Sequence, residues 1–324
     1  MAAIIEKSTG TGKANLEVFS ATLQNLAQED RDIVVVTSDS RGSGKLIPFG
    51  QKFPRQIIEV GIAEQNLVGV AAGLASGGKK VFAVSPACFL TARALEQIKN
   101  DVAYSDNPVK LIGISAGVSY GALGSTHHSL HDYAVLRAIN NMTIVAPADN
   151  YEAAETIKLA ASFNKPIYVR FGKKNMPDLK PVHDMPFVIG TGRTICEGND
   201  VAFIATGETV YPSVLAAKKL KNEYNIEATV ISMHTIKPLD YDLVRMTANK
   251  CKAVLTVEEH SVNGGLGEAC ASFLMQNGST TPFKIVGIPD EYTVTGSQNE
   301  IFNHYGISES GLANTALELL KKTK

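Results

Sequence analysis

The chain has 324 residues, of which 44% are hydrophobic and 19% charged, and its formal net charge is −1. This balance offers no electrostatic attraction to nucleic acid or to an anionic membrane. The length suggests about two domains. No apolar run reaches the ~20 residues of a membrane-spanning helix, and the N-terminus lacks the basic and apolar regions of a signal peptide. We therefore expect a soluble, cytoplasmic, globular protein.

The four cysteines lie far apart in the sequence and form no CxxC pair. This spacing predicts reduced thiols, with neither a disulfide framework nor a cysteine metal site. The residues concerned are Cys88, Cys196, Cys251 and Cys270.

Strand-like apolar runs alternate with helix-like segments along the whole chain, which is typical of parallel sheets covered by helices on both faces. In the first half the runs predict strands at 33–37, 81–85, 110–115, 143–146 and 167–171. The segments between them predict helices at 16–28, 63–76, 91–102, 131–137 and 152–162.

The pattern resumes in the second half after a stretch rich in Lys, Pro and Asp at 172–186, which we interpret as a linker. Strands are predicted at 201–205, 228–232, 253–257 and 283–287, and helices at 211–224, 239–249, 267–276 and 308–320. The sequence therefore predicts an α/β fold of two domains, 10–175 and 187–324.

The most informative residue is Glu64, a carboxylate in the small, apolar stretch 57–75, whose pattern is that of a buried helix start. Burying a lone carboxylate is costly unless it meets a charge or a hydrogen-bond donor, so such a residue is a candidate for proton transfer. An acid near a helix N-terminus is also explained by the helix dipole alone. Taken alone, the residue leaves both interpretations open.

The string Val-Gly-Ile-Ala-Glu-Gln-Asn at 60–66, with the small residues that follow it, closely resembles the pyrimidine-binding domain of transketolases. The resemblance implies that Glu64 hydrogen-bonds N1′ of the thiamine diphosphate pyrimidine. There a neutral acid drives the 4′-amino group through the imino tautomer that deprotonates the thiazolium C2. Related patterns occur in 1-deoxyxylulose-phosphate synthases and in β subunits of 2-oxo-acid dehydrogenases.

The resemblance covers nearly the whole chain and is strongest over 57–171. Its order matches the last two domains of a transketolase, a pyrimidine-binding domain followed by the transketolase C-terminal domain. The family's first domain binds the diphosphate through Mg²⁺ with a Gly-Asp-Gly motif, and this chain has no such string. The resemblance thus implies the C-terminal (B) subunit of a split transketolase, whose A subunit carries the Gly-Asp-Gly motif and the Mg²⁺, in an α2β2 heterotetramer.

Three histidines lie within Gly121–Asp132, in the string Gly-Ala-Leu-Gly-Ser-Thr-His-His-Ser-Leu-His-Asp. A zinc site is one interpretation, but His127 and His128 are adjacent and would point in different directions. A polar surface loop is another. The resemblance implies that His127 faces the substrate carbonyl and transfers protons, that His128 supports the substrate site, and that His131 and Asp132 open the next helix.

The stretch 85–97 resembles the family segment that packs the aminopyrimidine ring. Phe89 matches an aromatic residue that stacks on the ring, although a core phenylalanine is equally compatible. The family carries aromatic residues at two nearby positions, which are occupied by Pro86 and Ala92 in this chain. Arg93 is thus either a cofactor contact or a group that reaches toward partner or substrate.

The loop after the first strand, Thr-Ser-Asp-Ser-Arg-Gly-Ser-Gly-Lys at 37–45, lies where open α/β sheets place ligand loops. The resemblance implies that Asp39 lies near the cofactor and Ser43 near the sugar phosphate, and that Arg170 grips the substrate phosphate. Lys45 is either a further phosphate contact or a solvated cation, and we favour the latter.

Three departures from the family concern the substrate. Gly12 stands where many transketolases carry a phosphate-binding arginine, Ser115 replaces a histidine, and Leu123 replaces the aspartate that reads the C2 hydroxyl of the sugar. Losing a hydroxyl-reading acid changes substrate discrimination. We therefore expect ketol transfer between a ketose phosphate and an aldose, with an atypical sugar phosphate such as an apulose phosphate as a candidate.

The loop 257–267 opens a predicted helix after glycines, so it is either an anion site or, as we favour, a strand-to-helix turn. His234 is interpreted as structural.

Rival functions are the β subunit of a 2-oxo-acid dehydrogenase, a deoxyxylulose-phosphate synthase-like enzyme, and a non-catalytic partner subunit that keeps the fold.

Overall fold

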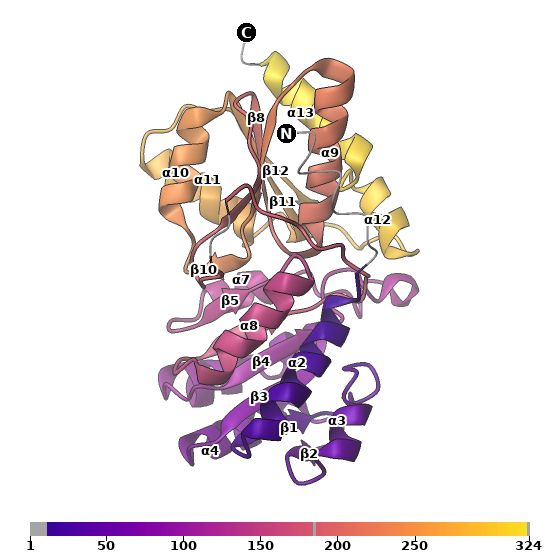
Figure 1. Ribbon diagram of the computed structural model, residues 1–324, viewed down its shortest axis with the longest axis vertical. Coiled ribbons are helices and arrows are strands. Elements are labelled where there is room, and N and C mark those ends of the chain that lie inside the picture. The colour runs from indigo at the N-terminus through magenta and orange to yellow at the C-terminus, as the bar shows by residue number, and fades with distance from the viewer. Residues whose placement is uncertain (1–11, 184–185, 323–324) are drawn as a thin grey trace.

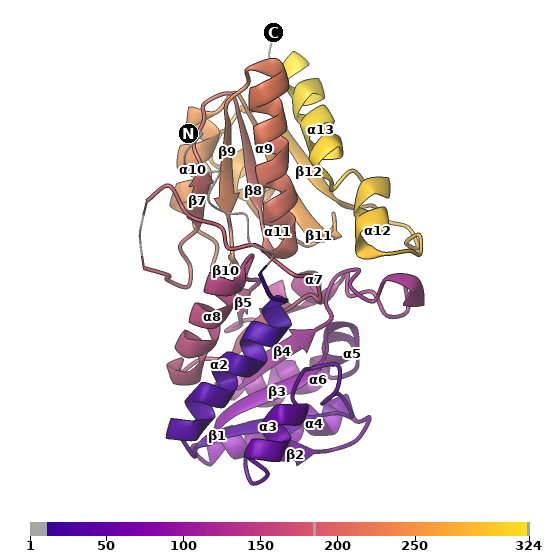
Figure 2. The same cartoon turned by 45° about the vertical axis from the view of Figure 1, so that its right-hand side comes forward.

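The computed structural model describes residues 12–183 and 186–322. Two α/β units are stacked along the long axis of the molecule, the first half of the chain below and the second above (Figures 1 and 2). Within the described residues, no helix combines the length and apolar character that crossing a membrane requires.

The first sheet has seven strands in the order β10-β5-β6-β4-β3-β1-β2, all parallel except β10. Strands β1 and β4 are buried along their whole length, as expected of a parallel sheet with both faces covered. The strands are β1 (Ile33–Thr37), β2 (Ile57–Glu59), β3 (Lys80–Pro86), β4 (Lys110–Ile114), β5 (Thr143–Val145), β6 (Ile167–Arg170) and β10 (Thr235–Lys237).

Helices surround this sheet on both sides (Figure 2). They are α2 (Asn15–Glu29), α3 (Ile47–Lys52), α4 (Glu64–Ser76), α5 (Ala87–Arg93), α6 (Leu95–Gln97), α7 (Asp132–Arg137) and α8 (Asn150–Ser162), with a π-helical turn η1 (Ile98–Tyr104) and a 3₁₀ turn η2 (Gly121–Leu123).

The second sheet has the order β12-β11-β8-β9-β7, with only β7 antiparallel. Alternate residues of β8 face opposite sides, so Phe203 packs in the core under α9 and α13 and Ile204 in the core under α10 and α11. The elements are β7 (Arg193–Cys196), β8 (Val201–Ala205), η3 (Gly207–Thr209), α9 (Val210–Tyr224), β9 (Ala228–Ser232), α10 (Tyr241–Lys250), β11 (Ala253–Ser261), α11 (Leu266–Gln276), β12 (Phe283–Ile288), α12 (Gln298–His304) and α13 (Glu309–Lys321).

The predicted α/β class is confirmed, and the predicted parallel strands are all present. The sequence missed short elements, namely α3, α12 and the edge strands β2, β7 and β10. Three or four residues at a sheet edge leave little periodicity to read. The predicted helix at 91–102 begins earlier, at Ala87, and is broken into α5, α6 and η1. The boundaries 10–175 and 187–324 stay a prediction.

The contacts between the units include a shared strand and a buried arginine. Strand β10, from the second half of the chain, pairs with β5 of the first sheet. Beside it, Arg193 of β7 donates from Nη1 to Glu152 Oε1 of α8 at 2.6 Å and from Nη2 to the Leu179 carbonyl. Asp149 caps α8 and lies 3.8 Å from the same Nη1. All three charged side chains are buried.

Replacing Arg193 with alanine leaves Glu152 and Asp149 buried without their cation, so we expect the free energy of unfolding to fall by about 3 kcal/mol. Differential scanning calorimetry measures the change. Arg245→Ala is the control, because Arg245 and Asp242 form an exposed pair and its loss should change stability by less than about 0.5 kcal/mol. Equal losses in both variants would contradict the expectation.

Candidate active site

The residues named from the sequence follow the carboxyl ends of β1, β2, β3 and β4, and Arg170 is the last residue of β6. Open parallel sheets bind ligands at this edge. Helix α4 begins five residues after β2, and α5 begins directly after β3. Gly61 makes the bend between β2 and α4 at a φ of 74°, a left-handed conformation that glycine adopts without strain.

Glu64 is the first residue of α4 and is 4% exposed. The last residue of α5, Arg93, donates from Nη1 to both Glu64 carboxylate oxygens at 3.0 Å. This ion pair compensates the carboxylate for the lost water. The two side chains line an open hollow of about 360 Å³ together with Ile62, Ala63 and Gln65.

Aromatic rings connect this pair to the histidine loop. The Arg93 guanidinium lies over the Phe89 ring, 4.2 Å from its centroid. His127 meets Phe89 edge to face at 5.3 Å and Tyr120 edge to face at 5.4 Å. The structure thus brings Glu64, Arg93, Phe89 and His127 into one continuous set of contacts.

Asp39 lies at the end of β1 with a φ of 52°, held by a residue that the sequence analysis missed. Glu59 Oε1 accepts from the backbone N–H groups of Asp39 and Gly61, and Arg41 lies 3.3 Å from Oε2. Burial opposes ionisation of Glu59, but these donors outweigh it and lower the pKa of its carboxyl group. The feature of the sequence that could have indicated Glu59 is its place as an acid at the end of a short strand, β2.

The Ser43 hydroxyl donates to the Ser40 carbonyl of the same loop at 3.2 Å, so it shapes the loop. The Ser40 hydroxyl in turn donates to the Val84 carbonyl of β3. The contacts of Ser43 therefore neither favour nor oppose a place beside the substrate phosphate.

Lys173 is a second residue that the sequence analysis missed, because it falls in the predicted linker. Its ammonium group lies over the Tyr120 ring, 3.9 Å from the centroid. Burial, and then the charge of Lys45, lower the pKa of Lys173. Lys45 itself lies 3.5 Å from Glu17, so the exposed Lys173 beside the Tyr120–His127 contact is the cation available to attract an anion.

The structure places Arg170, the predicted phosphate ligand, at the junction of the two units. Its side chain is buried, and Nη2 donates to the carbonyl oxygens of Glu259 at 2.6 Å and Ser129 at 3.3 Å. Its Nε lies 3.4 Å from Asp132 Oδ2, and its guanidinium covers the Tyr133 ring. These contacts favour a role in joining the two units over direct phosphate binding.

The structure shows His128, another predicted substrate residue, bonded within the chain. The ring is buried, with Nε2 donating to the Gly121 carbonyl at 3.0 Å and Nδ1 accepting from the Thr293 hydroxyl at 2.6 Å. Burial lowers its pKa. Because His127 points to Phe89 and His128 to Thr293, the geometry also opposes a shared zinc site, and the described residues contain no group of three or more His, Cys, Asp or Glu arranged for a metal.

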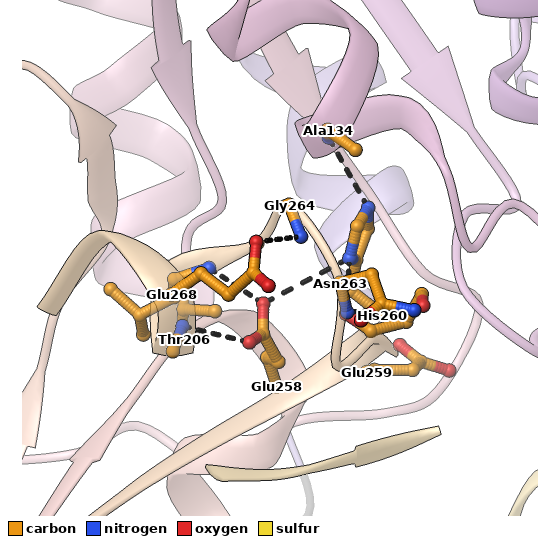
Figure 3. Close-up of polar contacts among 12 residues, drawn as sticks. Ala134, Thr206, Glu258, Glu259, His260, Asn263, Gly264 and Glu268 are labelled. Carbon is orange, nitrogen blue, oxygen red and sulfur yellow. Dashed lines mark hydrogen bonds and ion pairs between the residues drawn. The ribbon is translucent and has the colours of Figure 1, made fainter. Parts of the chain in front are cut away.

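The glycine loop before α11 is occupied by the chain itself (Figure 3). Glu258 of β11 accepts from the backbone N–H groups of Leu266 and Gly267 at 2.7 and 2.8 Å. The carboxylate takes the place that an external anion would need at this helix start. The turn interpretation of this loop is therefore favoured over the anion site.

Next to it, two acids share one partner at the junction of the units. Gln298 Nε2 donates to Glu208 Oε2 and Glu259 Oε1, both at 2.8 Å. The loops of the first unit approach closely, since a Cβ at Gly172 would lie 2.1 Å from Glu208 Oε1 and one at Gly117 2.1 Å from Glu259 Cδ. Burial, and then the charge of Glu259, raise the pKa of Glu208 to about 8.

This raised pKa makes stability depend on pH. Between the ordinary glutamate pKa near 4.5 and about 8, folded Glu208 keeps a proton that the unfolded chain has released. The free energy of unfolding should therefore fall as the pH rises through this interval. Glu208→Gln should flatten the dependence in thermal melts from pH 5 to 8, whereas Glu223→Gln, at an exposed acid, should leave it unchanged. Parallel curves for all three proteins would contradict the assignment.

The sequence matches the family described as "Transketolase, pyrimidine binding domain" over residues 12–178 and the family described as "Transketolase, C-terminal domain" over 190–312. The chain belongs to the transketolase family. The expected family, fold class and enzyme type are confirmed.

Individual relatives agree with this placement. A protein of Phocaeicola vulgatus, named as the B subunit of an apulose-4-phosphate transketolase, is 49% identical over 304 residues, which cover 94% of this chain and 96% of that protein. A solved structure described as "Split gene transketolase, inactive beta4 tetramer" is 34% identical with a TM-score of 0.84, covering 97% of this chain and 100% of that chain. A 1-deoxy-D-xylulose-5-phosphate synthase of Halothermothrix orenii is 35% identical over 94% of this chain but 48% of that protein.

Proposed function

We propose that the chain is the C-terminal (B) subunit of a thiamine-diphosphate-dependent transketolase that moves a two-carbon ketol unit from an atypical ketose phosphate, such as an apulose phosphate, to an aldose. The observation that carries this proposal is the buried Glu64 carboxylate, which Arg93 connects to the Phe89 ring, and the edge-to-face contact of that ring with His127. The relative from Phocaeicola vulgatus, which matches over nearly its full length, supports the substrate class.

The residues present fit the aminopyrimidine end of the cofactor, because a buried carboxylate that lines a hollow and an aromatic ring near it suit a flat, hydrogen-bonding ring. When bound, thiamine diphosphate supplies the nucleophilic carbon that carries the two-carbon unit. Glu64 holds a proton at the pyrimidine N1′, and Phe89 orients the ring. His127, fixed by Phe89 and Tyr120, moves a proton at the oxygen of the substrate carbonyl.

The rest of the cofactor site is assigned to a partner chain. We infer that an A subunit with a Gly-Asp-Gly motif holds the diphosphate through Mg²⁺, and that the two chains form an α2β2 assembly. Support comes from the names of two relatives, which mark each as the B type of subunit, and from the solved split-gene protein, which is described as an inactive beta4 tetramer. Purifying the chain with and without a co-expressed Gly-Asp-Gly partner tests this, since ketol transfer should require both.

For the substrate phosphate, we infer a contact with the exposed Lys173 rather than with Arg170, whose buried side chain already donates to backbone carbonyls. Leu123, an apolar residue four positions before His127, is 54% exposed. This supports a sugar whose recognition does not require an acid at that point.

The rival assignments are separable by experiment. A deoxyxylulose-phosphate synthase or a 2-oxo-acid dehydrogenase would consume pyruvate and release carbon dioxide, whereas the proposed enzyme transfers a ketol unit without releasing any. If the reconstituted complex decarboxylated pyruvate but transferred no ketol unit, one of these two enzymes would be favoured over the transketolase. A complex that keeps full activity after Glu64→Ala would favour the non-catalytic subunit.

Glu64→Gln should lower kcat of the reconstituted enzyme about 10³-fold, because an amide cannot exchange a carboxylic proton with the pyrimidine N1′. Hydrogen–deuterium exchange at C2 of bound thiamine diphosphate, followed by NMR, should slow in parallel. Glu96→Gln is the control, since Glu96 is an exposed acid of the neighbouring α6 and its loss should leave both rates unchanged. A lowered kcat with normal C2 exchange would show that Glu64 acts at a step other than the deprotonation of C2.

Lys173→Ala should raise KM for a phosphorylated ketose about tenfold, the effect of losing one charge-assisted contact. KM for the same sugar without its phosphate should stay the same. Lys180→Ala, at another exposed lysine of the connecting segment, serves as the control in the same steady-state assays. An equal rise for both sugars would indicate that Lys173 acts on the shape of the loop instead.

A further inference from the structure

The Arg93 guanidinium makes two contacts at once that a flat ring bound in this site would need. It lies on the face of Phe89, with Cζ 4.2 Å from the ring centroid. It also donates to both oxygens of Glu64 at 3.0 Å. One planar group therefore fills the space between the aromatic face and the carboxylate.

The chemistry of the group suits this position. A guanidinium is planar and delocalised, carries its N–H donors in the plane, and stacks on aromatic faces. An aminopyrimidine is likewise flat, stacks on aromatic rings and presents polar atoms at its edge. Two flat groups cannot occupy the same face of Phe89 while each bonds the single Glu64 carboxylate, so binding of one excludes the other.

We propose that Arg93 is an internal stand-in for the aminopyrimidine ring, which occupies the pyrimidine place in the chain without cofactor and swings out when the cofactor binds. The inference rests on the proposed function and adds a residue that sets cofactor affinity. Before assembly, the stand-in also keeps the buried Glu64 carboxylate paired with a cation.

The two partners differ in freedom. Glu64 is 4% exposed and begins a helix packed against β3, whereas the Arg93 side chain is 48% exposed at the end of α5. Arg93 can therefore rotate into solvent without opening the core, while Glu64 and Phe89 stay as the fixed walls. Displacing Arg93 breaks an ion pair and a cation–π contact, so it weakens cofactor binding by the free energy of those contacts.

The first experiment uses the full chain by itself, because Glu64, Phe89 and Arg93 all belong to it. The probe is 4-amino-5-hydroxymethyl-2-methylpyrimidine, titrated by ligand-observed NMR. Arg93→Ala should bind it about tenfold more tightly than the unaltered chain, equivalent to about 1.4 kcal/mol. Guanidinium ion at millimolar concentration should compete with the probe in Arg93→Ala and have little effect in the unaltered chain.

Arg93→Gln is the second variant, since it retains length and polarity but loses the charge and the fork of donors, and thermal melts check that both variants fold. Arg245→Ala is the matched control, an arginine–carboxylate pair in the other unit, and should bind the probe like the unaltered chain. Equal or weaker probe binding by both Arg93 variants would overturn the stand-in.

The second experiment measures the dissociation constant of thiamine diphosphate for the complex with the Gly-Asp-Gly partner by calorimetry. Tighter binding by Arg93→Ala supports the inference. Weaker binding would make Arg93 a cofactor or partner contact and overturn it. If the unaltered complex bound no thiamine diphosphate, the proposed function would fail, yet the probe titration would still decide the role of Arg93.

Discussion

The geometry of the site depends on one buried cation at the junction of the two units. The Arg170 guanidinium binds the carbonyl oxygens of Ser129, in the first unit, and Glu259, in the second, while Asp132 supplies the opposite charge. Burial opposes the charge of Arg170, but Asp132 outweighs that effect and raises its pKa. A buried cation bound from both sides holds the units in one arrangement, because moving either one removes part of the compensation for its buried charge.

The loop that carries His127 is the element most affected by this arrangement. Its start is held where the Val118 N–H donates to Glu259, and its end where His128 meets Thr293. Both partners belong to the second unit, although that unit supplies none of the residues assigned to chemistry. The second unit therefore contributes to the site by fixing a loop of the first, which gives the transketolase C-terminal domain a physical role in this chain.

The sequence was sufficient where function is recorded in a local string. Glu64, Phe89 and His127 were predicted from their neighbours, and the structure brings them into one set of contacts. The parallel strands were predicted from continuous apolar runs, because a covered sheet imposes that composition. It was insufficient where a role depends on distant residues. Arg170 and His128 match family positions, yet their contacts come from partners 89 and 165 residues away. Lys173 was overlooked because its contact with the Tyr120 ring cannot be predicted from the linker-like composition around it.

The pairing of β10, from the second half of the chain, with β5 of the first sheet limits how the protein can be divided into fragments. Strand β10 covers the backbone of β5 at the border of the first sheet, so a fragment ending before residue 235 would present unpaired N–H and C=O groups there. Open strand edges of this kind recruit other chains and promote aggregation. A break in the polypeptide between the two units would thus cost solubility as well as geometry. The two units therefore depend on being parts of one polypeptide, although the composition of the segment between them is that of a linker.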